Sequence, residues 1–181
     1  MRHSHLSRVW QILVIAGPYS LALLVVAILE LLNAYYAGQL GTLELQGVGL
    51  GMIVLMLFGF ALIVGFIYGY EVLGPQAYGA ENYSRMGHYF NRARILLFIL
   101  NVVTFPIFYF AGNVLYSVGI NKAISDFAGN FLRLTYPGFL FKSQAILARV
   151  HMKAQRIMWP ALIIQLCLLV IHISGLQIFV F

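Results

Sequence analysis

Polar side chains inside otherwise apolar segments are the residues of this sequence that could do chemistry. Glu30 and Asn33 lie three residues apart, so on a helix they share a similar face. A carboxylate buried in a membrane is energetically expensive and marks a functional site by default, so Glu30 is a candidate for carrying a proton. The favoured alternative is structural, an ion pair of Glu30 with Lys142 or with a neighbouring subunit.

A second polar pair, Gln165 and His172, lies near the end of the sequence. The two residues are seven positions apart and therefore share one face of a helix. They could line a cavity, but hydrogen bonding to a neighbouring helix is the favoured interpretation.

The sequence predicts no metal site, no cofactor and no enzymatic activity. His3 and His5 are terminal, while His88 and His151 are expected in basic loops. No nucleophile, base and orienting acid follow one another in the arrangement that catalysis requires. Cys167 is the single cysteine, which excludes an internal disulfide.

The elements that carry these polar residues are expected to lie in a lipid bilayer. The chain of 181 residues is 62% hydrophobic and 9% charged, whereas soluble domains carry about 25% charged residues. A helix crosses the bilayer with roughly 20 apolar residues, and five stretches qualify: 9–36, 46–70, 95–117, 127–148 and 158–181. The sequence therefore predicts an all-α membrane bundle of about five transmembrane helices, forming a single membrane domain over residues 1–181.

The basic residues predict how the chain is oriented. Eight of them precede the first span or follow the second and fourth spans: Arg2, Arg8, Arg85, Arg92, Arg94, Arg149, Lys153 and Arg156. The opposite links hold only Lys122. The positive-inside rule then places the N-terminus inside and the C-terminus outside, in a plasma, vacuolar or mitochondrial inner membrane. Because these charges alternate with membrane crossings, no nucleic-acid surface is expected.

Glycines punctuate the first two spans. Gly38-Gln39-Leu40-Gly41 is expected to allow a tight reversal after span one, followed by a short polar link. Span two carries two small-xxx-small pairs, Gly47 with Gly51 and Gly65 with Gly69. Such pairs let helix backbones approach closely, so we expect both to pack against other helices.

The segment that follows span two carries the most specific motif, Glu71-Val72-Leu73-Gly74-Pro75-Gln76-Ala77-Tyr78-Gly79-Ala80. Pro75 is expected to break the helix and Gly79 to shape the turn after it. The segment resembles the hallmark of the multidrug and toxic compound extrusion (MATE) family, approximately A-L-E-T-L-C-G-Q-A-Y-G-A in eukaryotic members. Val72, Gly74 and Pro75 depart from that pattern. Matching the family acid, Glu71 is expected to fix the inner loop, against Arg85 or Arg92.

Further family landmarks follow in order along the chain. Gly38 to Leu45 is similar to the family's G-H-L-G-x-L-E-L, and Pro18 sits where the first family helix has its proline. The remaining landmarks resemble the links and helices that follow: Gly87-His88-Tyr89 with Asn91-Arg92-Ala93, Phe131-Leu132-Arg133 with Pro137, and Gln155 with Pro160. The resemblance runs from about Trp10 to Trp159.

The resemblance implies the fold of a secondary antiporter, but only its first lobe as far as the fifth helix. Family members expel organic cations or drugs in exchange for protons or sodium, and their twelve spans form two lobes around a substrate cavity. Alternating access rocks one such repeat against the other. Bacterial relatives carry an Asp five residues before the glycine that opens the first turn. Here that position is Asn33, whose amide cannot take up a proton near neutral pH.

These features favour a MATE-like half-transporter that acts as a structural or accessory subunit of a larger multi-subunit membrane complex. Such a subunit would not transport by itself, and its partners would be the lipid bilayer and other membrane subunits. The alternative is one half of a proton- or sodium-coupled multidrug antiporter that another chain completes. An organic cation is an expected substrate only in that second case.

Overall fold

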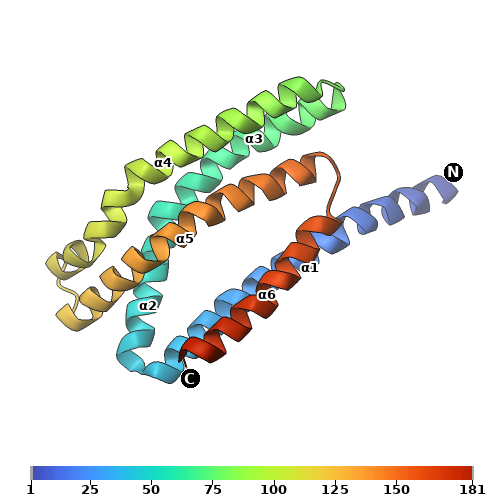
Figure 1. Ribbon diagram of the computed structural model, residues 1–181. Coiled ribbons are helices and arrows are strands. Elements are labelled where there is room, and N and C mark those ends of the chain that lie inside the picture. The colour runs from blue at the N-terminus through green and yellow to red at the C-terminus, as the bar shows by residue number, and fades with distance from the viewer. Residues whose placement is uncertain (1, 181) are drawn as a thin grey trace. The chain divides into compact units, whose positions relative to one another are not determined.

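Helices make up nearly all of the computed structural model, which describes the backbone of residues 2–180 and the side chains of residues 14 and 16–178. The elements in chain order are α1 (Arg2–Leu40), α2 (Thr42–Val54), the π-helix η1 (Leu55–Phe60), α3 (Ala61–Gly79), α4 (Tyr83–Ser117), α5 (Lys122–Ala154) and α6 (Trp159–Val180) (Figure 1). Because η1 joins α2 to α3 without a break, these elements form five long rods. The described residues contain no strand, and the predicted all-α class is confirmed.

The rods group into two compact units. Unit one holds α1 up to Tyr36 together with α6, and unit two spans Ala37–Ala154. Four of the five rods are long and apolar enough to cross a membrane: Ala16–Leu40, Thr42–Gly79, Tyr83–Ser117 and Trp159–Ile178. The predicted membrane bundle is therefore confirmed, while the single domain over residues 1–181 stays a prediction.

The remaining predicted span, 127–148, lies within α5, which is not among the four apolar rods. α5 packs against α2, α3 and α4, so other helices cover one of its faces. Its buried residues recur every three or four positions and include polar ones: Ser125, Ala128, Gly129, Leu132, Tyr136, Phe139, Ser143 and Leu147. A helix sheltered in this way need not be apolar throughout.

The link between the first two rods is shorter than expected. α1 continues to Leu40 and α2 begins at Thr42, so the expected polar link is the single residue Gly41. Gly41 has a φ of 154°, a conformation that L side chains rarely adopt and that glycine reaches without steric cost. The reversal after span one therefore rests on this one residue.

Pro75 does not break the helix, contrary to expectation, because α3 continues through it to Gly79. α4 and α5 likewise continue through a proline, Pro106 and Pro137, and membrane helices tolerate this where neighbouring groups satisfy the freed backbone carbonyl. The expected role of Gly79 in the turn falls to Glu81, which adopts a positive φ of 55°. The Glu81 amide donates to the Tyr78 carbonyl at 3.0 Å and the next amide to the Ala77 carbonyl at 3.0 Å, the pattern of a Schellman helix end.

Glycines bring α2 and α5 into close contact. A Cβ built on Gly47 would lie 2.7 Å from the ring of Phe127, and Gly51 is equally crowded by the next turn of α5. The predicted packing role is confirmed for this pair. It is wrong for Gly65 and Gly69, because no described atom lies within 4 Å of a Cβ at either position.

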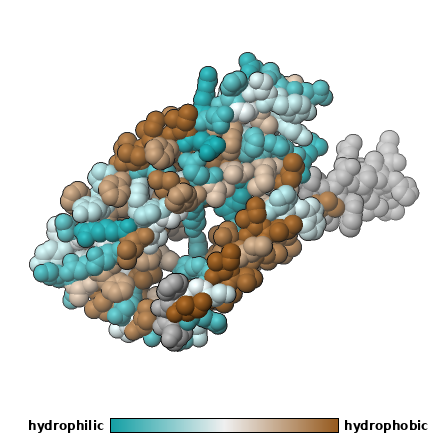
Figure 2. All heavy atoms as spheres, viewed as in Figure 1, coloured by the Kyte–Doolittle hydropathy of each residue, from teal (hydrophilic) through white to brown (hydrophobic). Residues whose placement is uncertain are grey.

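Apolar side chains cover the outward faces of α4 and α6. Figure 2 shows hydrophobic atoms along both helices. The side chains concerned are more than half exposed: Val102, Val103 and Phe110 on α4, and Val170, Ile171 and Ile178 on α6. Contiguous apolar surface of this kind is rare on proteins that meet water and fits contact with lipid or with other membrane helices.

Candidate functional site

Two of the predicted polar residues meet within unit one, between α1 and α6. His172 Nε2 lies 2.8 Å from Asn33 Oδ1, and both side chains are half-buried. An amide oxygen only accepts, so the imidazole N–H donates. In the neutral ring this bond requires the tautomer that carries its hydrogen on Nε2. His172 thus makes an interhelical hydrogen bond, the interpretation favoured for it from the sequence.

The other predicted intramembrane polar residues are distributed over both units. Glu30 lies on α1 and is exposed, whereas Gln165 on α6 is only 7% exposed. Lys142 belongs to unit two, where its Nζ lies 4.6 Å from the centre of the Phe60 ring, an arrangement that stabilises a cation. Because Glu30 and Lys142 lie in different units, their expected ion pair stays a prediction.

A second polar cluster joins α3 to the C-terminal end of α5. Glu71 Oε1 lies 2.5 Å from Lys153 Nζ, and beside this pair Tyr70 and His151 share a hydrogen bond between the hydroxyl and Nδ1. The expected partners of Glu71 were Arg85 or Arg92. That expectation is wrong, since the acid pairs with Lys153 and thereby ties α3 to α5.

The histidines expected in basic loops lie in helices instead: His88 in α4 and His151 in α5. The His151 ring stacks on Phe90, with ring centres 4.3 Å apart. Burial lowers the pKa of His151, because the imidazolium would lose hydration between these rings. No three His, Cys, Asp or Glu side chains converge as metal ligands in the part of the chain that the structure describes.

The other residues of the motif form the last turn of α3. The Ala80 amide donates to the Gln76 carbonyl at 3.1 Å, and Ala77, which is buried, supplies the carbonyl that accepts from Asn82. Gly79 is the last helical residue. Asn82 then caps α4, its Oδ1 accepting from the Arg85 amide at 3.0 Å. These residues therefore shape the α3–α4 turn through backbone contacts.

A buried polar network between α4 and α5 was missed by the sequence analysis. Asn101 is 1% exposed, and its Nδ2 donates to Ser143 Oγ at 3.1 Å and to the Leu97 carbonyl at 2.7 Å. The Tyr136 hydroxyl donates to the Asn101 carbonyl and lies 3.3 Å from Thr104 Oγ1. The available signal was a polar amide inside an uncharged apolar run, since such side chains find partners across helices.

The family of the chain follows from its match to known sequences. A family model described as MatE matches residues 18–176, which include all of these contacts. The chain belongs to the MatE family.

Three MatE relatives come from Arabidopsis thaliana. Protein DETOXIFICATION 23 is 32% identical over 106 residues, which are 59% of this chain and 22% of that protein. Protein DETOXIFICATION 35 is 32% identical over 102 residues, 56% of this chain and 21% of that protein. Protein DETOXIFICATION 36 is 27% identical over 155 residues, 84% of this chain and 31% of that protein. The chain spans less than a third of the length of these curated relatives.

Membership of the MatE family gives a context to the contact between α1 and α6. Asn33 stands five residues before Gly38, where the resemblance places the acid of bacterial members. The oxygen of this amide accepts from His172. An amide neither binds nor releases a proton near neutral pH, so Asn33 cannot act as an acid at this position.

Proposed function

We propose that this MatE chain is a helical module of a larger membrane assembly and does not drive proton-coupled transport by itself. The observation that carries the proposal is the hydrogen bond between Asn33 and His172 at 2.8 Å. Asn33 stands at the position of the bacterial acid, and its amide oxygen already accepts the hydrogen bond that joins α1 to α6. A group that cannot change charge cannot couple a proton gradient to conformation.

The exposed apolar faces of the rods support the proposal of partners in the plane of the membrane. The apolar side chains of α4 and α6 are more than half exposed, and lipid or neighbouring helices must cover them. Transmembrane helices associate through close packing and interhelical hydrogen bonds. We propose that other membrane subunits cover part of this surface, with the N-terminus inside, as the basic residues favour.

Isolation of the tagged full chain from its native membrane in a mild detergent tests the proposal. The expected result is a particle that contains other membrane proteins at fixed stoichiometry, after washing with high salt and with excess detergent. Val170→Ser and Ile171→Ser each place a polar residue on the outward face of α6. These two variants probe the proposed contact between this face and the other membrane subunits. Recovery of the chain alone, or only with copies of itself, would contradict the proposal.

One half of a proton-coupled antiporter of organic cations is the second candidate, completed by another chain. The imidazole beside Asn33 favours it, because histidine can carry a proton near neutral pH. Related proteins whose names read DETOXIFICATION are in line with export. In this case protons should compete with tetraphenylphosphonium for binding to the purified particle. The variant His172→Gln keeps a donor for Asn33 but cannot titrate, so unchanged competition in it would remove His172 from the mechanism.

A further inference from the structure

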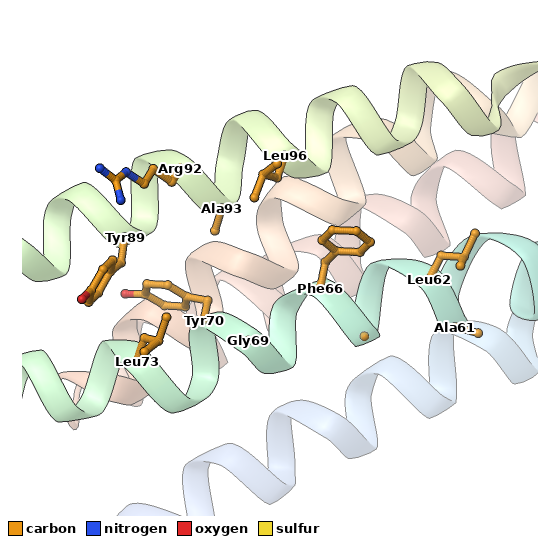
Figure 3. A pocket seen from close by; sticks show the side chains of 11 residues that line it. Ala61, Leu62, Phe66, Gly69, Tyr70, Leu73, Tyr89, Arg92, Ala93 and Leu96 are labelled. Atoms are coloured by element: carbon orange, nitrogen blue, oxygen red, sulfur yellow. The ribbon is translucent and has the colours of Figure 1, made fainter.

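A cleft of about 610 Å³ runs between α3 and α4 in unit two. Its walls are apolar along most of its length, with Leu62 and Phe66 on α3 and Leu96 on α4 (Figure 3). Gly65 and Gly69 also line it, and a Cβ at either position would meet no described atom within 4 Å. The volume lies within the range of about 300–1,000 Å³ that is typical of small-molecule sites.

The cleft follows from the sequence of the two helices. On α4 its lining residues Tyr89, Arg92, Ala93 and Leu96 lie on one helix face, three or four positions apart. On α3 the small residues recur every four positions at Ala61, Gly65 and Gly69. Glycines with this spacing normally let another helix approach, but here they leave a hollow.

The two ends of the cleft differ in polarity. Figure 3 shows Arg92 and Tyr89 near Tyr70 at one end, while Ala61 and Leu62 lie at the other. Arg92 is exposed, and its guanidinium forms no ion pair with any described residue. The cleft thus combines a cationic end with an apolar body.

The length of the cleft matches one leaflet of a bilayer. The lining residues of α3 extend from Ala61 to Leu73, and twelve helical steps of about 1.5 Å amount to roughly 18 Å. Half of the hydrocarbon core is about 15 Å thick. The cationic end lies toward the α3–α4 turn, near Arg85 in the first turn of α4. The positive-inside rule assigns this side to the inner surface.

We propose that this cleft binds one acyl chain of an anionic glycerophospholipid, whose phosphate pairs with Arg92. The acyl chain lies over Gly65 and Gly69, between Phe66 and Leu96, and the headgroup stays at the inner surface beside Tyr89. Basic pockets between transmembrane helices on the cytoplasmic side commonly hold anionic headgroups, and a guanidinium is suited to bidentate contact with phosphate. The site does not depend on the function proposed above.

Native mass spectrometry of the full chain in detergent tests this site, with palmitoyl-oleoyl phosphatidylglycerol and phosphatidylcholine as probes. Both lipids have the same acyl chains, so the difference between them reports the headgroup. We expect the wild type to retain the anionic lipid about fivefold better, which corresponds to ~1 kcal/mol for one basic side chain. Equal retention of the two lipids would overturn the proposal.

Four variants separate the two parts of the site. Arg92→Gln should abolish the preference for the anionic lipid, whereas Arg85→Gln, an exposed neighbour outside the cleft, should keep it. Gly69→Leu fills the cleft and should reduce retention of both lipids to background. Gly138→Leu is its control, because Gly138 on α5 also has no described atom within 4 Å of a Cβ but lies outside the cleft.

Three further outcomes contradict the proposal. If Arg85→Gln and Arg92→Gln lower anionic-lipid retention equally, the attraction is a diffuse effect of the basic surface. If Gly69→Leu binds both lipids as Gly138→Leu does, the lipid is not in the cleft. A photo-cross-linker at Leu96 that labels a protein helix instead of a lipid acyl chain would identify another occupant. Gly65→Leu replaces Gly69→Leu if the latter loses helicity.

Discussion

The crossing of α4 and α5 at Gly112 and Gly129 allows a quantitative prediction. A Cβ on Gly129 would lie 3.0 Å from the Cα of Gly112 and 3.3 Å from its nitrogen. Ordinary contacts between carbon atoms are about 3.5–4.0 Å long, so the shortfall from the Cα is roughly 0.5–1.0 Å. Both atoms belong to helix backbone, so no flexible side chain can move aside. Gly129→Ala must therefore push the two helices apart.

The magnitude follows from two opposing terms. Overpacking of a tight contact costs about 1–3 kcal/mol, while replacing a helical glycine by alanine gains about 1 kcal/mol in helix propensity. Gly138→Ala, on the same helix with no described atom within 4 Å of its Cβ, receives only the gain. Since propensity is common to both variants, Gly129→Ala should be less stable than Gly138→Ala by about 1–3 kcal/mol.

Reversible unfolding in mixed micelles, followed by far-ultraviolet circular dichroism, measures this difference. The variants are compared at the same detergent composition, so that the wild type serves as a common reference. Equal stabilities for Gly129→Ala and Gly138→Ala would refute the close crossing, because no packing penalty would then distinguish the two sites.

Three further predictions concern the polar contacts of unit two. Burial lowers the pKa of His151, whereas the imidazole of the unfolded chain keeps a pKa of about 6.5. The contribution of His151 to the free energy of unfolding should therefore be constant above that pH and fall below it. His151→Gln should flatten this dependence between pH 8 and pH 5. A double-mutant cycle on Glu71 and Lys153, which are 29% and 37% exposed, should give a coupling below about 1 kcal/mol that decreases with salt. Asn101→Ala should lower the unfolding free energy by about 1 kcal/mol, because it removes the hydrogen bonds to Ser143 and to the Leu97 carbonyl, whereas Asn113→Ala, exposed on the same helix, should cost little.

The rods themselves could be predicted from the sequence, because long apolar runs have few alternatives to a membrane helix. The lower apolarity of α5 was not predicted. α5 packs against α2, α3 and α4, and this tertiary packing cannot be predicted from the apolarity of a single segment. Pro75 shows a second limit: a proline usually ends a helix, but α3 continues through it, which membrane helices tolerate when neighbouring groups satisfy the freed carbonyl.

The polar contacts were predictable only in part. Asn33 and His172 were recognised as polar residues in apolar runs, but their meeting joins positions 139 residues apart, and nothing local in the sequence pairs them. The partner of Glu71 was missed for the same reason. Arg85 and Arg92 follow it closely along the chain, whereas Lys153 is brought beside it by the packing of α3 on α5.

Proton-driven efflux of ethidium from proteoliposomes that contain the isolated native particle would show whether His172 couples protons to transport. We propose that the bond between His172 and Asn33 is structural and that this MatE chain does not couple protons to transport. Any efflux is expected to be the same for the wild type and for His172→Gln at every imposed pH gradient. Efflux that the wild type performs and His172→Gln loses, with the particle intact, would contradict it.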